Sequence, residues 1–340
     1  MSALCVHFGT CGGCATQDLP PAEYRARKRE MVVRALARHG VEAQVDEIFA
    51  IPPGTRRRCV IKIKDGKIGF HARASHDIVD MRECRVLTSG LFGLAQRLRD
   101  IAGEIGTAEV HATEADNGFD LMLRWDRKIT PALTAKLADW AARGNVARIT
   151  SGNEILVELA APLWRGVRLP PGAFLQPTRE GEAFLQTEVA RIAGKAKSAV
   201  DLFAGCGTFA LALAPRMKVH AVELEAAPLA ALSAAARATS GLRPVTVEKR
   251  DLFKSPVSAP ELRAYDAAVL DPPRAGAAAQ VAELGKSGVR RIAYVSCNAD
   301  SFARDALVLL GAGCKIGNVR PVDQFLWSEH IELVASFTRD

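Results

Sequence analysis

The second half of the chain alternates short apolar runs with helical patterns, and this alternation limits the possible folds more than any other feature. From Ala199 onward the apolar runs are SAVDLF, KVHAVEL, RPVTVE, YDAAVLD and RIAYVSC, separated by helical patterns. Such β/α units in series predict a doubly wound parallel sheet. The final runs, CKIGNVRPV and HIELVASFTR, have no long helix between them, which predicts a closing antiparallel pair. The expected fold class is α/β.

The first half of the chain follows a different pattern and predicts smaller, separate segments. Residues 1–19 are rich in cysteine, and residues 20–42 predict a basic amphipathic helix that stops at Gly40. Residues 43–170 mix short strands with helices, and RCVIKIKDGKIGFHA predicts a hairpin turning at Asp65-Gly66. GFDLMLRW and NEILVELA predict further strands, while 91–105 and 131–142 predict helices. The sequence RLPPGAF marks a boundary, so we expect the α/β domain to cover residues 171–340.

Length and composition describe an ordinary globular protein. The chain has 340 residues, 49% hydrophobic and 24% charged, which excludes a disordered chain and predicts about two domains. No apolar stretch approaches the roughly 18 residues of a membrane span. The opening MSALCVHFGTCGGC lacks the basic and apolar regions of a signal peptide. A cytoplasmic protein is therefore expected.

The net charge of +7 is concentrated in one stretch. Residues 51–73 contain Arg56, Arg57, Arg58, Lys62, Lys64, Lys67 and Arg73 against Asp65 alone. Basic surfaces attract polyanions such as nucleic acids, because neutralised phosphates release counterions. The alternative is a strand edge that lysines protect from pairing. Charge alone leaves both interpretations open.

The spacing of the eight cysteines indicates a metal centre rather than disulfides. Cys5, Cys11 and Cys14 fall close together, and Cys84 follows in MRECRVL, whereas Cys59, Cys206, Cys297 and Cys314 are scattered singly. A triplet with a distant fourth thiolate fits a 4Fe–4S cluster or an all-cysteine zinc site. Spacing does not separate iron from zinc. A cytosolic chain of this size has no need of disulfides.

A glycine-rich loop follows the first strand of the α/β region. In Asp201-Leu-Phe-Ala-Gly-Cys-Gly-Thr208, Gly205 and Gly207 allow a tight turn and close approach of a ligand. Glu223 follows about 20 residues later, where an acid can accept hydrogen bonds from ribose hydroxyls. A dinucleotide site is possible, since Ala210 stands where its fingerprint tolerates Gly or Ala. The acid at the head of the loop instead resembles the pattern of class I S-adenosyl-L-methionine-dependent methyltransferases.

Three further groups lie at strand ends of the same region, where open α/β sheets bind ligands. One strand ends in Leu270-Asp271-Pro-Pro-Arg274, the next in Ser296-Cys297-Asn298, and the last begins at His330-Ile-Glu332. Cys297 is a candidate nucleophile and Glu332 a candidate base. Methylation of carbon 5 of a pyrimidine needs both groups. A thiolate adds at carbon 6 to activate the ring, and a base then removes the carbon-5 proton so that the cysteine can leave.

The chain resembles the RNA uracil-5 methyltransferases that modify 23S ribosomal RNA, over nearly its whole length. The motifs that carry this resemblance, in order, are Cys5…Cys11-Gly-Gly-Cys14-x-x-Gln17, Cys84-x-Val-Leu, Phe174-Leu-Gln176, Asp201-Leu-Phe-x-Gly-Cys-Gly, Asp271-Pro-Pro-Arg, Ser296-Cys297-Asn298 and His330-x-Glu332. The resemblance implies a class I methyltransferase fold of the Rossmann-like type, with an α+β RNA-binding domain over 43–170 and an iron–sulfur segment at the N-terminus. It also implies a monomer.

The resemblance implies roles for individual residues as well. Cys297 would be the nucleophile and Glu332 the base. The S-adenosylmethionine site would be lined by Gln176, Phe203, Thr208, Glu223 and Asp271, and a 4Fe–4S cluster would be held by Cys5, Cys11, Cys14 and Cys84. The chain departs from the family at Thr208, where members often have Asn.

Some members begin with a small OB-like RNA-binding domain, whereas only four residues precede Cys5 here. This favours the shorter ribosomal branch, and the tRNA branch normally lacks the cysteine cluster. Three other activities remain as alternatives: the same chemistry on tRNA, an iron–sulfur redox protein, and a non-catalytic iron–sulfur RNA-binding protein. A cytosine-5 enzyme is disfavoured, because Asp271-Pro-Pro-Arg lacks the cysteine that such enzymes place after a proline.

Overall fold

The computed structural model describes residues 4–339, which form two compact units. Of the described residues, unit 1 comprises 4–20, 52–179 and 326–328, and unit 2 comprises 21–51, 180–325 and 329–339. The sequence predicts continuous domains along the chain, whereas each unit of the structure is made of three separate stretches. The helix after the cysteine segment belongs to unit 2, and the chain passes from unit 1 to unit 2 at residue 180 rather than 171.

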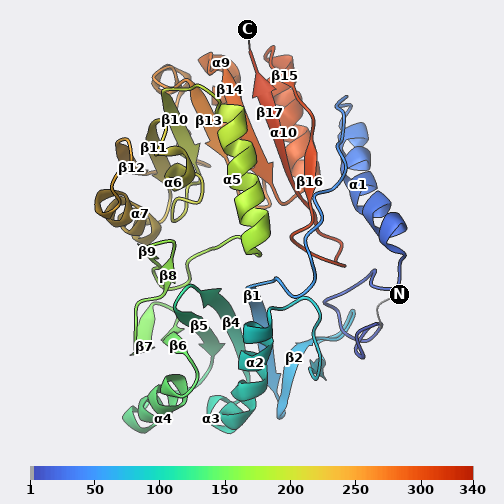
Figure 1. Cartoon of the computed structure of the whole chain (residues 1–340), viewed down its shortest axis with the longest axis vertical. Coiled ribbons are helices and arrows are strands. Elements are labelled where there is room, and N and C mark those ends of the chain that lie inside the picture. Colours follow the sequence, from blue (N-terminus) through green and yellow to red (C-terminus); the bar gives the residue numbers. More distant parts are fainter. Residues whose placement is uncertain (1–3, 340) are drawn as a thin grey trace. The chain divides into compact units, whose positions relative to one another are not determined.

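Unit 2 is built on a mixed sheet of eight strands in the order β12-β11-β10-β13-β14-β17-β15, with β16 also paired to β17 (Figure 1). The first five of these strands are parallel, and β17 runs antiparallel to β14. Their bounds are β10 (Ser198–Leu202), β11 (Lys218–Glu223), β12 (Val245–Lys249), β13 (Ala267–Leu270), β14 (Arg291–Ser296), β15 (Lys315–Ile316), β16 (Arg320–Val322) and β17 (Glu332–Thr338). The expected parallel sheet with a closing antiparallel strand is confirmed.

Helices cover both faces of this sheet. They are α1 (Pro21–Arg38), α5 (Arg179–Ala193), α6 (Ala210–Leu213), α7 (Ala226–Ala238), α8 (Ala259–Leu262), α9 (Ala278–Ser287) and α10 (Ala299–Gly311). On one face, Val32 of α1 packs in a cluster with Phe302 of α10 and Val200 of β10. On the other face, Leu185 of α5 packs with Phe209 and Ala199. Because alternate strand residues point to opposite faces, the uniformly apolar strands supply both cores.

The apolar face of α1 explains why this helix belongs to unit 2. Val32, Ala35 and Leu36 are at most 3% exposed. Burying a side chain such as Val or Leu contributes about 1.5–3 kcal/mol to folding. The position of α1 beside α10 is visible in Figure 1.

Unit 1 contains a seven-stranded sheet in the order β3-β2-β1-β4-β5-β6-β7 and a small β8-β9 ribbon. The strands are β1 (Arg58–Lys64), β2 (Lys67–His71), β3 (Ile78–Asp80), β4 (Ala108–Ala115), β5 (Gly118–Trp125), β6 (Val146–Ser151), β7 (Glu154–Glu158), β8 (Leu163–Trp164) and β9 (Val167–Arg168). The β1–β2 hairpin turns at Asp65-Gly66, as expected, and both residues have positive φ, as a two-residue turn of this kind requires.

The helices of unit 1 pack on one face of its sheet, and residues such as Leu91, Leu94, Leu133 and Trp140 join the core there. They are α2 (Ser89–Arg97), α3 (Ala102–Ile105) and α4 (Pro131–Ala142), with a 3-10 turn, η1 (Leu98–Asp100), after α2. The expected helix over 91–105 is therefore interrupted, since Ile101 leaves the helical region at φ −123°. No helix within residues 4–339 has both the length and the apolar character that crossing a lipid bilayer requires.

Candidate active site

Cys297 and Glu332 lie at the same end of two neighbouring antiparallel strands. The ladder between β14 and β17 ends with the pair Ser296 and Leu333, so Cys297 and Glu332 occupy the next position. On its other side Glu332 is paired with Val322 of β16. The register of the sheet therefore brings together two groups that are 35 positions apart in the sequence. Their side chains interact electrostatically, which the pKa of Cys297 reflects.

The Cys297 thiol is held in its protonated form. Burial, followed by the negative charges of Glu332 and Asp271, raises the pKa of Cys297 to about 12, and Arg274 opposes this rise. A thiol in such surroundings is unreactive until a proton acceptor or a bound ligand changes its environment.

Glu332 is 3% exposed, and burial raises the pKa of its carboxyl well above the usual value. The charge of Asp271 raises this pKa further, while a hydrogen bond with Gln324 lowers it. Within residues 4–339 its Oε1 atom is buried without a hydrogen-bond partner. A carboxyl group of raised pKa with one free oxygen is suited to accepting a proton from a ligand.

Residues around this pair are fixed by hydrogen bonds. Asn298 caps α10 by accepting from the amides of Asp300 and Ser301, and its Nδ2 donates to the Arg274 carbonyl at 2.9 Å. Arg274 in turn donates to Nδ1 of His330 at 3.0 Å. These contacts link the ends of β13, β14 and β17. They also hold Arg274, whose positive charge lowers the pKa of Cys297, at the edge of the site.

The glycine-rich loop lies at the end of β10, next to β11 and β13 in the sheet. Gly205 and Gly207 both have positive φ, and a Cβ on Gly207 would lie 2.4 Å from Leu232. The Gly205 amide donates to Oε2 of Glu223 at 3.0 Å, and Oε1 accepts from Leu224 and Glu225. Glu223 therefore shapes the loop, and its Oε2 keeps a lone pair for a hydroxyl of a ligand.

The structure places four of the five expected cofactor residues in unit 2. Glu223, Thr208 and Asp271 follow or end three adjacent strands, and Phe203 has a φ of 65°. The ring of Phe203 lies 5.5 Å from that of Phe253, centroid to centroid. The two rings are tilted by 55° to each other, and an aromatic side chain beside a glycine-rich loop is compatible with an adenosine group.

Gln176 lies in unit 1, and Arg57 and Arg58 of the basic stretch hold its segment in place. Arg57 is 1% exposed, and its Nε donates to the Gln176 carbonyl at 3.0 Å. Arg58 donates to the Leu175 carbonyl at 2.8 Å and lies 4.3 Å above the ring of Phe174. This part of the basic stretch is therefore engaged inside the protein, which the charge pattern alone did not predict. The role of Gln176 stays a prediction.

The four cysteines expected to bind a cluster lie close together in unit 1. Burial raises the pKa of Cys14 to about 12, and the nearby Cys84, Cys11 and Cys5 raise it further. The Gly13 amide lies 3.4 Å from Sγ of Cys11 as a donor. Within the part of the chain that the structure describes, no three His, Cys, Asp or Glu side chains are arranged around one metal ion. Each thiolate of a 4Fe–4S cluster binds a different iron, so cluster ligands need not meet at a point.

Cys59 was expected to stand alone, but it lies near this group. Its pKa is raised to about 12 by burial and by Cys84, while Arg56 and Arg58 lower it. Arg56 also interacts with Cys84 and Cys14. The cysteine group therefore has the partly buried cation of Arg56 beside it.

Sequence patterns did not reveal two residues near the proposed catalytic pair, Gln324 and Lys28. Gln324 hydrogen-bonds Glu332. Asp201, which the loop motif already contained, is a fully buried carboxyl that interacts with Asp271 and Glu223. Lys28 is a buried lysine on α1. One signal was present: Tyr24, Lys28 and Val32 share a helical face, so a lysine occupies the apolar stripe of α1.

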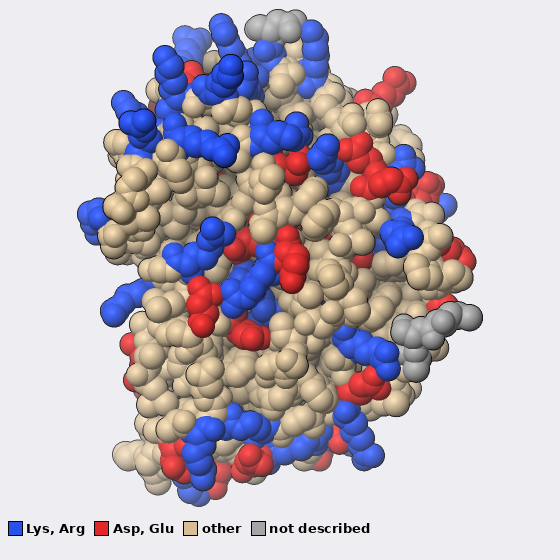
Figure 2. Space-filling model, viewed as in Figure 1, with Lys and Arg blue, Asp and Glu red and all other residues tan. Residues whose placement is uncertain are grey.

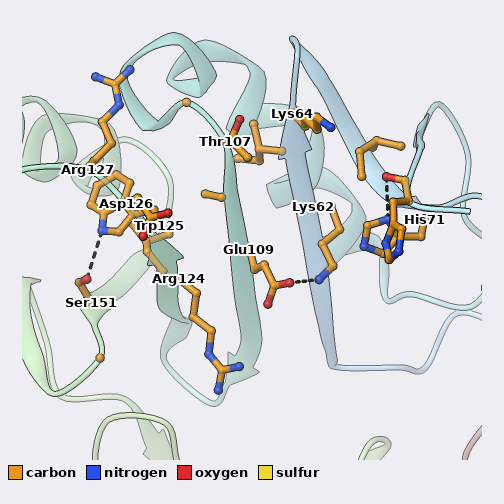
Figure 3. A pocket seen from close by; sticks show the side chains of 17 residues that line it. Lys62, Lys64, His71, Thr107, Glu109, Arg124, Trp125, Asp126, Arg127 and Ser151 are labelled. Atoms are coloured by element: carbon orange, nitrogen blue, oxygen red, sulfur yellow. Dashed lines mark hydrogen bonds and ion pairs between the residues drawn. The ribbon is translucent and has the colours of Figure 1, made fainter.

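Unit 1 also has a broad hollow of about 920 Å³ on its sheet, lined mainly by β1, β4 and β5. Figure 3 shows Lys62 directed toward Glu109, with Arg124, Trp125 and Arg127 on the neighbouring strand and the loop after it. Lys64 and Arg124 are exposed. In the face that Figure 2 shows, Lys and Arg gather at the top and at the lower edge, and near the middle they are mixed with acidic side chains.

Comparison with known proteins identifies the family. Residues 166–339 match the family model described as tRNA (uracil-5-)-methyltransferase. An RNA methyltransferase of Rhizobium meliloti is 41% identical, over 98% of this chain and 85% of the relative. The 23S rRNA (uracil(1939)-C(5))-methyltransferase RlmD of Pectobacterium atrosepticum is 32% identical, over 99% of this chain and 80% of its own length.

A solved structure supports the fold. The Pyrococcus abyssi tRNA (uracil-54, C5)-methyltransferase in complex with S-adenosyl-L-homocysteine superposes with a TM-score of 0.73, at 21% identity, over 96% of this chain and 86% of that one. The fold is thus the Rossmann-like fold of S-adenosylmethionine-dependent methyltransferases. The chain belongs to the tRNA (uracil-5-)-methyltransferase family and is an RNA (uracil-5-)-methyltransferase.

Proposed function

We propose that this enzyme methylates carbon 5 of a uridine in 23S ribosomal RNA, with Cys297 as nucleophile and Glu332 as base. The observation that carries the proposal is the pairing of these two side chains at adjacent strand ends. Each step of the reaction needs one of them. Asp271 and Arg274 complete the site as the neighbours that raise and lower the pKa of Cys297.

The proposed reaction begins when the Cys297 thiol loses its proton to water and the resulting thiolate adds to carbon 6 of the uracil, forming the carbon 6–sulfur bond. S-adenosylmethionine supplies the methyl group, which is transferred to carbon 5. Glu332 then takes the carbon-5 proton, the electrons of that bond form the carbon 5–carbon 6 double bond, and the Cys297 thiolate leaves. A uridine in folded RNA must first be flipped out of its stack. The unpartnered Oε1 of Glu332 supports its part in this sequence.

We assign the binding of S-adenosylmethionine to the strand ends of unit 2. Oε2 of Glu223 is available to a ribose hydroxyl, and the ring of Phe203 is available to the adenosine. Thr208 lies in the loop after β10, and Asp271 lies in the loop after β13. Gln176 is included on the resemblance of its motif. No atom lies within 4 Å of the position that a Cβ on Gly205 would occupy, so a ligand has room to approach this backbone closely.

The choice of 23S rRNA over tRNA rests on two observations. The relative that is 32% identical acts, by its name, on 23S rRNA. The chain also carries the cysteine group Cys5, Cys11, Cys14 and Cys84, which, by the family resemblance, the tRNA branch normally lacks. The likeness to the tRNA enzyme, at 21% identity, supports the fold and carries no argument about substrate.

The same four cysteines are proposed to hold a 4Fe–4S cluster. Their mutual electrostatic interaction and the Gly13 amide beside Cys11 support it, since amide donors stabilise cluster sulfur. Methyl transfer moves no net electrons, so the cluster would organise unit 1 rather than take part in the reaction. The proposed roles of Cys297 and Glu332 therefore do not depend on redox chemistry at the cluster.

RNA is proposed to contact the hollow on the sheet of unit 1. The exposed Lys64 and Arg124 supply phosphate contacts there, and the half-buried Trp125 supplies an aromatic edge whose Nε1 donates to Ser151. Arg57 and Arg58 are excluded from this surface by their internal contacts.

Methyl transfer from labelled S-adenosylmethionine to 23S rRNA and to bulk tRNA tests the proposal, with anaerobically purified protein and nucleoside analysis. We expect labelled 5-methyluridine in 23S rRNA alone. Label in tRNA would keep the chemistry and overturn the substrate. Label in neither RNA, with S-adenosylmethionine still bound, would favour a non-catalytic RNA-binding protein.

A further inference from the structure

The segment between β16 and β17 leads directly into Glu332. It begins with Asp323 and Gln324, which are both 1% exposed, and ends with His330 and Ile331. The Gln324 side chain hydrogen-bonds Glu332. Whatever fixes this segment therefore fixes both the backbone of Glu332 and the partner of its carboxyl.

Lys28 of helix α1 binds both ends of the segment. Its Nζ donates to the carbonyl of His330 at 2.5 Å and to that of Phe325 at 3.0 Å. The same Nζ lies 3.0 Å from Oδ1 of Asp323. Two carbonyl groups accept hydrogen bonds from this ammonium group, and the Asp323 carboxylate pairs with its charge. One buried side chain thus closes the segment into a loop.

Asp323 is held independently of Lys28. Tyr24, one helical turn before Lys28, donates to Oδ2 of Asp323 at 2.5 Å. The Asp323 amide donates to the Phe49 carbonyl at 3.0 Å. A buried ion pair is a weak source of stability, because desolvation offsets much of the attraction. The geometric effect of the Lys28–Asp323 pair is the stronger reason for its presence.

We propose that Lys28 is a positioning residue for the base of the reaction: by tying Asp323, Phe325 and His330 together, it holds Glu332 in place to take the carbon-5 proton. The inference rests on the proposed function of Glu332. Helix α1, which the sequence predicts only as a basic amphipathic helix, would thereby help to position the proposed base.

The proposal predicts which step fails when Lys28 is removed. Addition of Cys297 to carbon 6 and methyl transfer do not use Glu332 as a base. Resolution of the methylated adduct does, because the carbon-5 proton must leave as the Cys297–carbon 6 bond breaks. Loosening the segment should therefore slow resolution and leave covalent protein–RNA adduct to accumulate.

The test uses the double variant Lys28→Met with Asp323→Asn in the full-length enzyme, which removes both charges and leaves no buried charge unpaired. Adduct formation is measured on denaturing gels with 23S rRNA, and adduct resolution by release of tritium from uridine tritiated at carbon 5. We expect formation within about 2-fold of wild type and resolution about 10- to 100-fold slower, the usual effect of a misplaced reacting group.

A second variant reaches the same segment from the opposite side. A Cβ on Gly181 in α5 would lie 2.4 Å from Oε1 of Gln324, so Gly181→Ala should displace Gln324 from Glu332 without touching the ion pair. We expect the same accumulation of adduct. The matched control is Arg34→Met, on the same helix, where the side chain is 71% exposed and pairs with Glu30. It should change neither rate.

The outcomes separate the two proposals. Equal loss of formation and resolution in the Lys28/Asp323 variant, or no change in either rate, would overturn the positioning role. Glu332→Gln is measured in parallel. If that variant accumulates no adduct, the assignment of the base itself is wrong. If it accumulates adduct while the Lys28/Asp323 and Gly181 variants behave as wild type, only the positioning role is overturned.

Discussion

Cys297 and Glu332 stand opposite each other one position beyond Ser296 and Leu333, the last pair of the β14–β17 ladder. Residues directly opposite in an antiparallel pair project on the same face of a sheet. The nucleophile and the base of the proposed reaction therefore share one face because of strand register. A shift of either strand by one residue would send one side chain to the other face.

Cys297→Ala should abolish methyl transfer while S-adenosylmethionine still binds. The variant loses the thiolate that activates carbon 6, and loss of a nucleophile lowers turnover by about 10⁴-fold or more in other enzymes. Turnover with 23S rRNA and binding of S-adenosylmethionine by calorimetry are the two measurements. Cys314→Ala, at a buried cysteine in the core behind the sheet, is the control and should keep turnover. Methyl transfer that survives in Cys297→Ala contradicts the mechanism.

The pKa of Cys297 should respond to its charged neighbours in opposite directions. Glu332 raises this pKa and Arg274 lowers it, so Glu332→Gln should make the thiol ionise at lower pH and Arg274→Met at higher pH. The measurement is the pH dependence of alkylation of the Cys297 peptide by iodoacetamide, followed by mass spectrometry without RNA. Wild type should show slow alkylation that still rises at the highest pH tested, since burial raises this pKa to about 12. Shifts in the same direction for both variants would contradict the site geometry.

Much of this architecture could be predicted from the sequence because it depends on local patterns. The strands of unit 2 were visible as apolar runs bounded by turn residues, and Asp65-Gly66 predicts a hairpin because both positions adopt positive φ. The positions of Cys297 and Glu332 at neighbouring strand ends could also be predicted, since each residue belongs to a motif there, while their roles in catalysis stay a prediction.

Long-range contacts could not be predicted in the same way. The arginine run was interpreted as surface charge, yet Arg57 is buried against the segment that contains Gln176, more than 100 residues away. Lys28 likewise donates to the carbonyl of His330, about 300 positions away in the sequence, and no local pattern predicts such a contact. Periodicity shows which face of a helix is buried, but it does not show which distant carbonyl groups will satisfy a buried cation.

Asp201 should make the enzyme less stable as pH rises. Burial, followed by the charges of Asp271 and Glu223, raises its pKa from 3.8 to about 8, against an opposing hydrogen bond from Ala210. The folded protein therefore retains a proton that the unfolded chain loses above pH 3.8, and the free energy of unfolding falls between these values by up to about 1.4 kcal/mol per pH unit.

Asp201→Asn removes this contribution. We expect urea denaturation to show a smaller fall in stability from pH 5 to pH 8 in the variant than in wild type. Asp266→Asn is a useful contrast, because hydrogen bonds from Lys197 and Ser198 lower the pKa of Asp266, so its loss should not flatten the profile. An unchanged pH dependence in Asp201→Asn would show that Asp201 ionises normally in the folded protein.

Lys64 and Arg124 should contribute to RNA affinity through phosphate contacts. Each change to Ala should weaken binding to 23S rRNA fragments and reduce the slope of log affinity against log salt by about 0.7–0.9 per lost contact. Fluorescence anisotropy at several salt concentrations measures both quantities. Lys286→Ala, at an exposed lysine of α9 in unit 2, serves as the charge-matched control. A fall in affinity without a change in slope would assign these residues a role other than phosphate binding.

Arg57→Met should differ from those variants in kind. Arg57 is 1% exposed and donates to a backbone carbonyl, so its removal breaks a buried hydrogen bond from a charged group, which contributes about 1.5–3 kcal/mol. We expect a lower midpoint of thermal unfolding. If the variant kept its stability and bound RNA more weakly, Arg57 would instead contact RNA, as the basic stretch of the sequence predicts.

The cysteine group can be tested through its metal content alone. If Cys5, Cys11, Cys14 and Cys84 hold a 4Fe–4S cluster, anaerobically purified protein should contain about four iron and four sulfide per chain. Changing any one of the four to Ser should lower both, because each thiolate binds its own iron. Cys59→Ser is the sharpest control, since Cys59 lies beside Cys84 and is subject to the same Arg56 charge. It should retain the iron. About one zinc per chain, or loss of iron in Cys59→Ser, would overturn this ligand assignment while leaving Cys297 and Glu332 untouched.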